Sequence, residues 1–175
     1  MENKNKVKNE WLEWLKAIIV AVVIAFFVHT FIFATSIVEG ESMEPTLENG
    51  ERVIFNKFIY IINEPKRGDI IIIQHPNKNY VKRIIALPGE TIEVANNELY
   101  INGEKYQETF LSEEISNKTG RFGPIVIPED SYFVMGDNRG ISKDSRNGLG
   151  YIQRDEIIGR SEVIIYPFSE WDLTR

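Results

Sequence analysis

Hydrophobic positions in this chain change their spacing near residue 37. Residues 1–16 are largely polar and include four lysines, whereas residues 17–34 form a continuous apolar run without a charged side chain. Eighteen helical residues rise about 27 Å, which is close to the thickness of a bilayer's hydrocarbon core. Lysines ahead of such a run favour a cytoplasmic N-terminus. We therefore expect a cytoplasmic segment at 1–16, a transmembrane signal-anchor helix at 17–36 and an extracytoplasmic domain at 37–175.

A cleavable secretory signal is the alternative interpretation of the same segment. The sequence Ala34-Thr35-Ser36 resembles a small-residue processing site. The apolar run is, however, longer than the roughly 7 to 15 residues that are usual for the core of a secretory signal. Cleavage there would also release the downstream domain from the membrane. These two arguments favour the uncleaved anchor.

Beyond the apolar run, short apolar stretches alternate with turn residues, a pattern typical of antiparallel β structure. The expected strands cover 52–55, 70–73, 80–87, 91–94, 99–101, 131–135 and 162–166. We interpret the polar stretch 107–122 as a surface excursion, and a short helix is compatible with 153–158. The predicted fold class is mainly β: one N-terminal transmembrane helix followed by an antiparallel β-sheet or barrel-like domain that is all β.

Composition excludes several classes of chemistry. The chain has no cysteine, so disulfides, thiolate nucleophiles and thiolate metal sites are ruled out. Its two histidines, His29 and His75, lie in the apolar run and in a loop-like stretch, which disfavours a histidine triad or a zinc site. A net charge of -6 argues against nucleic acid as a partner, because phosphate binding needs a basic surface. We expect no metal and no organic cofactor.

Candidate chemistry begins at Ser42, in the stretch Gly-Glu-Ser-Met-Glu-Pro-Thr-Leu at 40–47. A serine hydroxyl is a weak nucleophile unless a base activates it. Lys82 lies among apolar and aromatic residues, and burial of that kind lowers a lysine pKa. The residues alone leave both roles open, because a serine in a glycine turn is commonly structural. A strand-edge lysine can likewise lay its stem on apolar side chains.

Three segments together resemble the successive signature boxes of type I signal peptidases. They are residues 40–47, the Tyr-Val-Lys-Arg at 80–83 with Leu-Pro-Gly behind it, and the Gly-Asp-Asn-Arg segment that opens 136–146. They occur in the family's order, and the resemblance extends to about residue 166. It implies that Ser42 is the acyl-forming nucleophile, with its own N–H as one oxyanion donor, and that Lys82 is the general base.

The resemblance also assigns the supporting residues. Ser142 corresponds to the hydroxyl that orients the lysine amine, and Asp144 would form an ion pair with Arg139 or Arg146. Gly40 stands where some members have a serine that donates to the oxyanion, and glycine there is typical of the Gram-positive branch. The second oxyanion donor is then the Gly40 N–H or a water.

Strand alternation and turn chemistry assign the neighbours of these residues. Alternation directs Arg83 away from Lys82, so we interpret Arg83 as a structural or charge-pairing residue. Asp137 and Asn138 are interpreted as turn formers, because both residue types hydrogen-bond their own backbone in tight turns.

Ser42 follows the apolar run closely, which places it near the outer membrane surface. A substrate suited to that position carries its scissile bond just past a membrane-inserted helix, behind small residues. Selection of small residues needs shallow apolar pockets. The candidates for lining them are Val38, Met43, Leu47, Val53, Tyr80 and Val81. Ordinary core packing is the alternative for each, and Phe168 and Trp171 are weaker candidates for contact with the membrane.

The sequence therefore predicts a membrane-anchored serine endopeptidase of a bacterial plasma membrane. It would remove N-terminal signal peptides from exported preproteins after small residues, with signal peptides and the lipid bilayer as partners. A self-cleaving repressor shares the serine–lysine pair but needs a DNA-binding domain in place of the apolar run. A membrane-tethered, non-catalytic β module that binds exported or membrane proteins is the alternative from another class. Convergence of Ser42, Lys82 and Ser142 in space separates the enzyme from that module.

Overall fold

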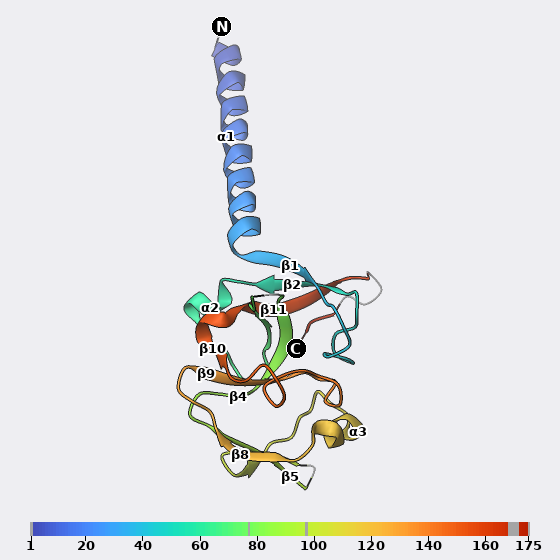
Figure 1. The fold of residues 1–175 in the computed structure, drawn as a ribbon. Coiled ribbons are helices and arrows are strands. Elements are labelled where there is room, and N and C mark those ends of the chain that lie inside the picture. Colours follow the sequence, from blue (N-terminus) through green and yellow to red (C-terminus); the bar gives the residue numbers. More distant parts are fainter. Residues whose placement is uncertain (1, 77, 97, 168–171, 175) are drawn as a thin grey trace.

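The computed structural model describes residues 2–76, 78–96, 98–167 and 172–174, and the side chains of the first helix only over 10–26. That helix, α1 (Glu2–Phe31), extends away from a β domain as a separate rod (Figure 1). Its described side chains are exposed. No helix among the described residues has both the length and the apolar character needed to span a bilayer.

α1 ends at Phe31, before the expected helix boundary at residue 36. The chain turns at Ile32, whose carbonyl accepts a hydrogen bond of 2.9 Å from the N–H of Lys57. Residues Phe33–Ile37 then form a strand, β1, that pairs antiparallel with β2. The boundary of 36 is therefore wrong, because cross-strand hydrogen bonding ends the helix although the sequence stays apolar.

The larger sheet has seven strands in the order β1-β2-β11-β3-β4-β9-β10, and neighbouring strands are antiparallel. Its members after β1 are β2 (Arg52–Asn56), β3 (Ile70–Ile73), β4 (Tyr80–Ala86), β9 (Ser131–Met135), β10 (Ile152–Gln153) and β11 (Ile157–Tyr166). β4 lies inside this sheet between β3 and β9. Its residues Lys82 to Ala86 are consequently buried on both faces.

The smaller sheet has four strands in the order β7-β6-β5-β8, also antiparallel. They are β5 (Thr91–Ala95), β6 (Glu98–Ile101), β7 (Glu104–Lys105) and β8 (Phe122–Val126). The remaining elements are short: α2 (Ile59–Ile62), α3 (Glu113–Ser116), and the 3₁₀ turns η1 (Asn117–Thr119) and η2 (Arg154–Glu156). The predicted mainly β, antiparallel architecture is confirmed.

All seven expected strands are present. The described residues form four further strands that the sequence analysis did not predict. β7 and β10 are too short to show a pattern, and β1 is hidden in the apolar run. β8 carries Gly123-Pro124, which argues against a strand in sequence. The short helix compatible with 153–158 is present only as the 3₁₀ turn η2, because β11 already begins at Ile157 and pairs with Ile73 of β3.

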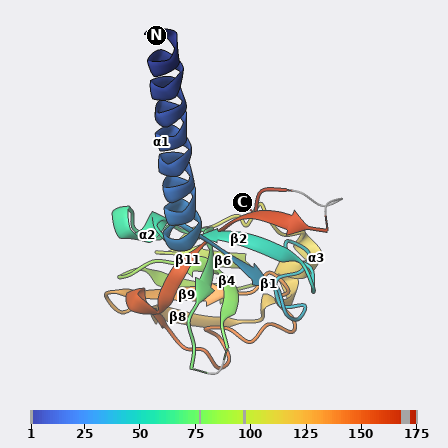
Figure 2. The same cartoon turned by 90° about the horizontal axis from the view of Figure 1, so that it is seen from above.

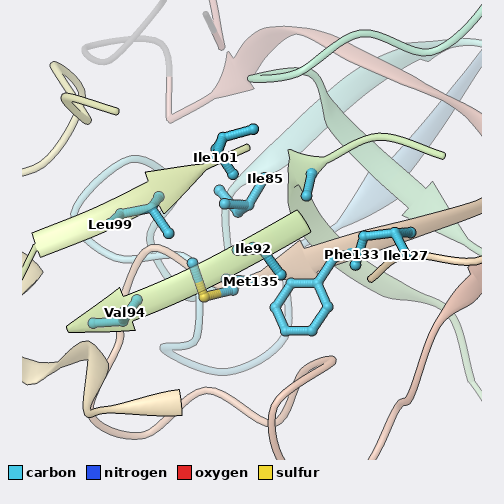
Figure 3. Close-up of a cluster of buried hydrophobic side chains, with 9 residues drawn as sticks. Ile85, Ile92, Val94, Leu99, Ile101, Ile127, Phe133 and Met135 are labelled. Carbon is cyan, nitrogen blue, oxygen red and sulfur yellow. The ribbon is translucent and has the colours of Figure 1, made fainter. Parts of the chain in front are cut away.

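Two buried hydrophobic clusters connect the sheets to the region around Ser42 and Lys82. One joins the smaller sheet to β4 and β9 through Ile85, Ile92, Val94, Leu99, Ile101, Ile127, Phe133 and Met135 (Figure 3). Another packs Val38, Met43, Leu47, Val53, Ile70 and Ile164 together beneath the turn that carries Ser42. Figure 2 shows the same fold turned by 90°, with α1 leading directly into β1.

Candidate active site

The turn between β1 and β2 fixes Ser42. Gly40 adopts a φ of +86°, in the left-handed region that favours glycine. Its N–H donates a 2.9 Å hydrogen bond to Oδ1 of Asn49. Met43 and Leu47, 1% and 0% exposed, anchor the turn in the cluster below it. The backbone around Ser42 is therefore held from both ends.

Lys82 approaches Ser42 from the middle of the larger sheet. Its backbone pairs with Ile71 of β3, and its side chain is 2% exposed. Nζ of Lys82 donates a hydrogen bond of 2.6 Å to Oγ of Ser42. The structure thus brings together the two residues that the sequence separates by forty positions.

Burial lowers the pKa of Lys82 to about 8, from an ordinary value near 10.5. The negative charges of Asp144 and Asp137 act in the opposite direction, while Lys78 and Arg146 lower the pKa further. At pH 7 about one lysine in ten is then neutral, against roughly one in three thousand for an unperturbed side chain. The site therefore holds a substantial fraction of Lys82 as a free amine.

Asp144 is the centre of a charged group beside Ser42 and Lys82. Arg146 Nη2 lies 2.8 Å from Asp144 Oδ2, and Arg146 Nε donates to Oδ1 at 2.9 Å. The N–H of Gly136 donates to Oδ2 at 3.0 Å. Burial alone would raise the pKa of Asp144, but the hydrogen bonds and charge of Arg146 and the Gly136 N–H hold that pKa below its usual value. Asp144 is consequently an anion that faces Lys82.

Gly136 packs against Ser42 and Ser142 at very short range. A Cβ on Gly136 would lie 2.2 Å from both Oγ of Ser142 and the carbonyl oxygen of Ser42. The same carbonyl accepts a 3.1 Å hydrogen bond from the N–H of Asn138. The segment 136–146 is thus joined to the Ser42 turn through backbone contacts.

The contact between Ser42 and Lys82 lies in a chain that is similar to known peptidases. The family model described as "Signal peptidase, peptidase S26" matches residues 11–166. The chain belongs to this signal peptidase family. A signal peptidase I of Bacillus licheniformis is 48% identical over 178 residues, covering 97% of this chain and 96% of that protein. Signal peptidase I S of Bacillus subtilis strain 168 is also 48% identical, with the same coverage.

A solved structure agrees with this assignment. The crystal structure of a signal peptidase I from Enterococcus faecalis V583 matches with a TM-score of 0.51 and 35% identity. The match covers 57% of this chain and 97% of that one. The predicted signal peptidase family is therefore confirmed by sequence and by fold.

A cavity of about 410 Å³ opens beside Ser42 and Lys82. Four of the six predicted pocket residues line it: Val38, Met43, Tyr80 and Val81. Leu47 and Val53 do not. Each is 0% exposed inside the cluster beneath the turn, so for these two the core interpretation is correct.

Sequence reasoning missed half of the cavity lining. The missed residues are Thr35, Ser36, Ile37, Glu39, Lys78 and Asn79. Three of them belong to β1. In the structure β1 alternates between exposed and half-buried positions, but its sequence Phe-Ala-Thr-Ser-Ile does not alternate between apolar and polar residues, so no sequence signal indicated this strand.

Among the supporting residues, Arg146 and Asp144 form the ion pair as predicted, whereas Arg139 does not contact Asp144. Arg139 pairs with Glu108 at 2.5 Å instead. Arg83 pairs with Asp137 at 2.6 Å, with side chains 2% and 0% exposed. Arg83 is thus the charge-pairing residue that alternation predicted, and Asp137 is its buried partner rather than a turn former.

Two predicted polar roles take a different form. The Gly40 N–H is already bound to Asn49, so here it is not the free donor that an oxyanion needs. The N–H of Ser42 has no acceptor among the described residues. Oγ of Ser142 is buried and also without a hydrogen-bond partner in the described part of the chain. Its expected role in orienting Lys82 stays a prediction.

Proposed function

We propose that this signal peptidase cuts preproteins with Ser42 as nucleophile and Lys82 as general base. Neutral Lys82 Nζ takes the Oγ proton as Oγ bonds to the scissile carbonyl carbon. The resulting ammonium gives that proton to the leaving amine as the C–N bond breaks, which leaves an acyl-Ser42. Water then attacks the acyl carbon while neutral Lys82 accepts one of its protons. The C–Oγ bond breaks, the Lys82 ammonium returns the proton to Ser42 Oγ, and the carboxylic acid product leaves.

The 2.6 Å contact between Lys82 Nζ and Ser42 Oγ carries this proposal. It supports proton transfer because the two atoms are within direct reach and burial keeps part of the lysine neutral. The unpartnered N–H of Ser42 is suited to stabilise the oxyanion of the tetrahedral intermediate. A tethered, non-catalytic module has no requirement for this pair, and the family assignment also speaks against it.

The cavity supports small side chains before the scissile bond. Its walls are β1 and the segment 78–82, with Val38, Met43 and Val81 as apolar surface beside Ser42. An extended substrate chain would run between β1 and the start of β4, with its scissile bond at Ser42. We expect the apolar surface beside Ser42 to favour small apolar side chains next to the cut.

We further propose that α1 is a transmembrane anchor in a bacterial plasma membrane, with residues 1–16 in the cytoplasm and the β domain outside. The uncharged run from 17 to 34 and the lysines ahead of it support this orientation. The exposed side chains at 10–26 also support it, because Trp11, Ile18 and Phe26 pack on nothing in the domain. Phe168 and Trp171 lie outside the described residues.

Cleavage of a purified preprotein by the full-length protein in detergent tests the dyad. We expect the wild type to release a product whose new N-terminus follows a small-x-small sequence. Ser42→Ala and Lys82→Ala should each abolish release, whereas Lys66→Ala, a change to an exposed lysine, should cut normally. If Ser42→Ala cut as fast as the wild type, Ser42 would not be the nucleophile and the dyad would be wrong. If the folded wild type cut nothing, the tethered binding module would become the better hypothesis.

A further inference from the structure

Glu108 and Arg139 form a buried ion pair outside the dyad. Arg139 Nη2 lies 2.5 Å from Glu108 Oε1, and Nη1 donates to Oε2 at 2.8 Å. The side chains are 0% and 3% exposed. Because desolvating two charges is costly, such a pair needs good geometry and additional hydrogen bonds. Glu108 belongs to the polar stretch 107–122, which the sequence presents as a surface excursion.

Arg139 connects this excursion to the segment that carries the supporting residues. Its Nε donates to the carbonyl of Gly136 at 3.0 Å, and its Nη1 also donates to Oγ1 of Thr119 at 3.1 Å. Arg146 reinforces the connection, because its Nη1 donates to the Thr119 carbonyl at 2.9 Å. Both ends of the excursion are therefore fastened to the segment 136–146.

Gly136 transmits this constraint to the dyad. Its carbonyl is held by Arg139, while its N–H donates to Asp144. Its Cα packs so closely on Ser142 and on the Ser42 carbonyl that no side chain fits there. A shift of Arg139 would therefore move the backbone that separates Asp144 from Ser42.

We propose that Glu108 is a positioning residue of this signal peptidase: through Arg139 it holds Gly136 and the Asp144–Arg146 pair against Ser42 and Lys82. Glu108 itself touches neither member of the dyad. The proposal rests on the dyad chemistry proposed above. It assigns a function in catalysis to an excursion that otherwise has the composition of a surface loop.

Loss of the contacts that join Glu108, Arg139 and Gly136 should change the pKa of Lys82. The charged groups around that amine are Asp137, Asp144, Lys78 and Arg146, but burial is the largest cause of its lowered pKa. A loosened segment 136–146 admits water, so the pKa of Lys82 rises toward its ordinary value. Each unit of rise lowers the neutral fraction about tenfold near pH 7. The acid limb of the rate profile should then move to higher pH.

The test uses the full-length protein in detergent, with kcat and KM measured on a preprotein from pH 6 to 10. For Glu108→Gln we expect kcat at pH 7 to fall about tenfold or more, KM to change less than about threefold, and the acid limb to move upward by about one pH unit. Glu108→Asp should recover part of the rate. Glu98→Gln is the matched control, because the Glu98–Lys105 pair has the same 2.5 Å distance but is 39% and 59% exposed. It should behave as the wild type.

Glu108→Gln leaves Arg139 without its counter-charge and could unfold the protein for that reason alone. The double variant Glu108→Leu/Arg139→Met removes both charges at similar volume and serves as the second test. It should unfold near the wild-type temperature yet show the same loss of kcat and the same shift of the acid limb. A folded double variant with wild-type kcat and pH profile would overturn the positioning role. Failure of the wild type itself to cut would count against the dyad proposal instead.

Discussion

Two neighbouring basic residues on β4, Lys82 and Arg83, have different partners and different chemical roles. Lys82 and Arg83 are each 2% exposed. Arg83 has a carboxylate partner, Asp137, whereas within the described chain Lys82 Nζ has no carboxylate close enough for an ion pair and contacts the Ser42 hydroxyl. A guanidinium keeps its proton and needs an anion when buried, but an amine can lose its proton. Only the lysine can therefore serve as a base.

The first prediction concerns pH. Lys82 must be neutral to accept a proton, and its pKa is about 8. We expect kcat/KM to rise roughly tenfold per pH unit below pH 8 and to level above it. Lys82→Arg should be inactive across this range. The measurement is a kcat/KM profile from pH 5 to 10, and an acid limb near pH 4 or 5 would point to a carboxylate base instead.

The second prediction concerns the close contact at Gly136. Gly136→Ala places a methyl group 2.2 Å from the Ser42 carbonyl and from Ser142 Oγ, so the two segments must separate. We expect kcat to fall by more than about tenfold, since small displacements of reacting groups are costly. Gly140→Ala is the control, because its new Cβ would meet only the Lys118 side chain at 3.8 Å. Equal activity of both variants would contradict the proposed contact.

At the scale of elements, the turn after β1 combines a reactive face with a structural one. Ser42 borders the cavity, while Val38 and Met43 contact both the cavity and the cluster beneath. Leu47, four residues further, is wholly inside that cluster. The turn is thus positioned by burial of its apolar residues, and this burial also fixes the position of Ser42.

Leu47→Ala tests this arrangement. Removing a wholly buried leucine should lower the free energy of unfolding by about 2 to 5 kcal/mol, depending on how far the cluster relaxes. Ile37→Ala changes a cavity-lining residue that is 53% exposed and should cost much less stability. Denaturant unfolding of both variants makes the comparison. A larger loss for Ile37→Ala would show that β1, rather than the cluster, supports the turn.

At the scale of the whole molecule, α1 and the β domain are joined directly through β1. The candidate processing site Ala34-Thr35-Ser36 lies within β1, where these residues pair with Phe55, Ile54 and Val53 of β2. Cleavage there would need the strand to leave the sheet. The pairing therefore supports an uncleaved anchor over a removable signal.

This gives a prediction for the protein in cells. The intact mass of the membrane-extracted protein should correspond to a chain that retains residues 1–36, and alkaline carbonate should leave the protein in the membrane fraction. A mature N-terminus between residues 34 and 37 would contradict the anchor and support the secretory-signal interpretation. Release by carbonate without cleavage would indicate peripheral attachment through α1.

Local patterns in the sequence determined much of this protein. Short apolar runs between turn residues indicated seven strands, because cross-strand packing selects such residues wherever one side of a strand is buried. The absence of cysteine and the scarcity of histidine disfavoured thiolate, triad and zinc chemistry, but the residues alone left the roles of Ser42 and Lys82 open. The resemblance of three motif segments to signal peptidases implied those roles, and strand alternation directed Arg83 away from Lys82.

Tertiary structure decided what depends on distant contacts. Pairing with β2 makes Phe33–Ile37 a strand. Leu47 and Val53 are buried in the core, and Arg139 forms its ion pair with Glu108 rather than with Asp144. Tertiary structure also lowered the pKa of Lys82, since desolvation arises only when β4 is enclosed by its neighbours. These cases share one physical reason. Burial and ion pairing depend on which distant segments contact each other in space, and a local pattern of residue types does not determine those contacts.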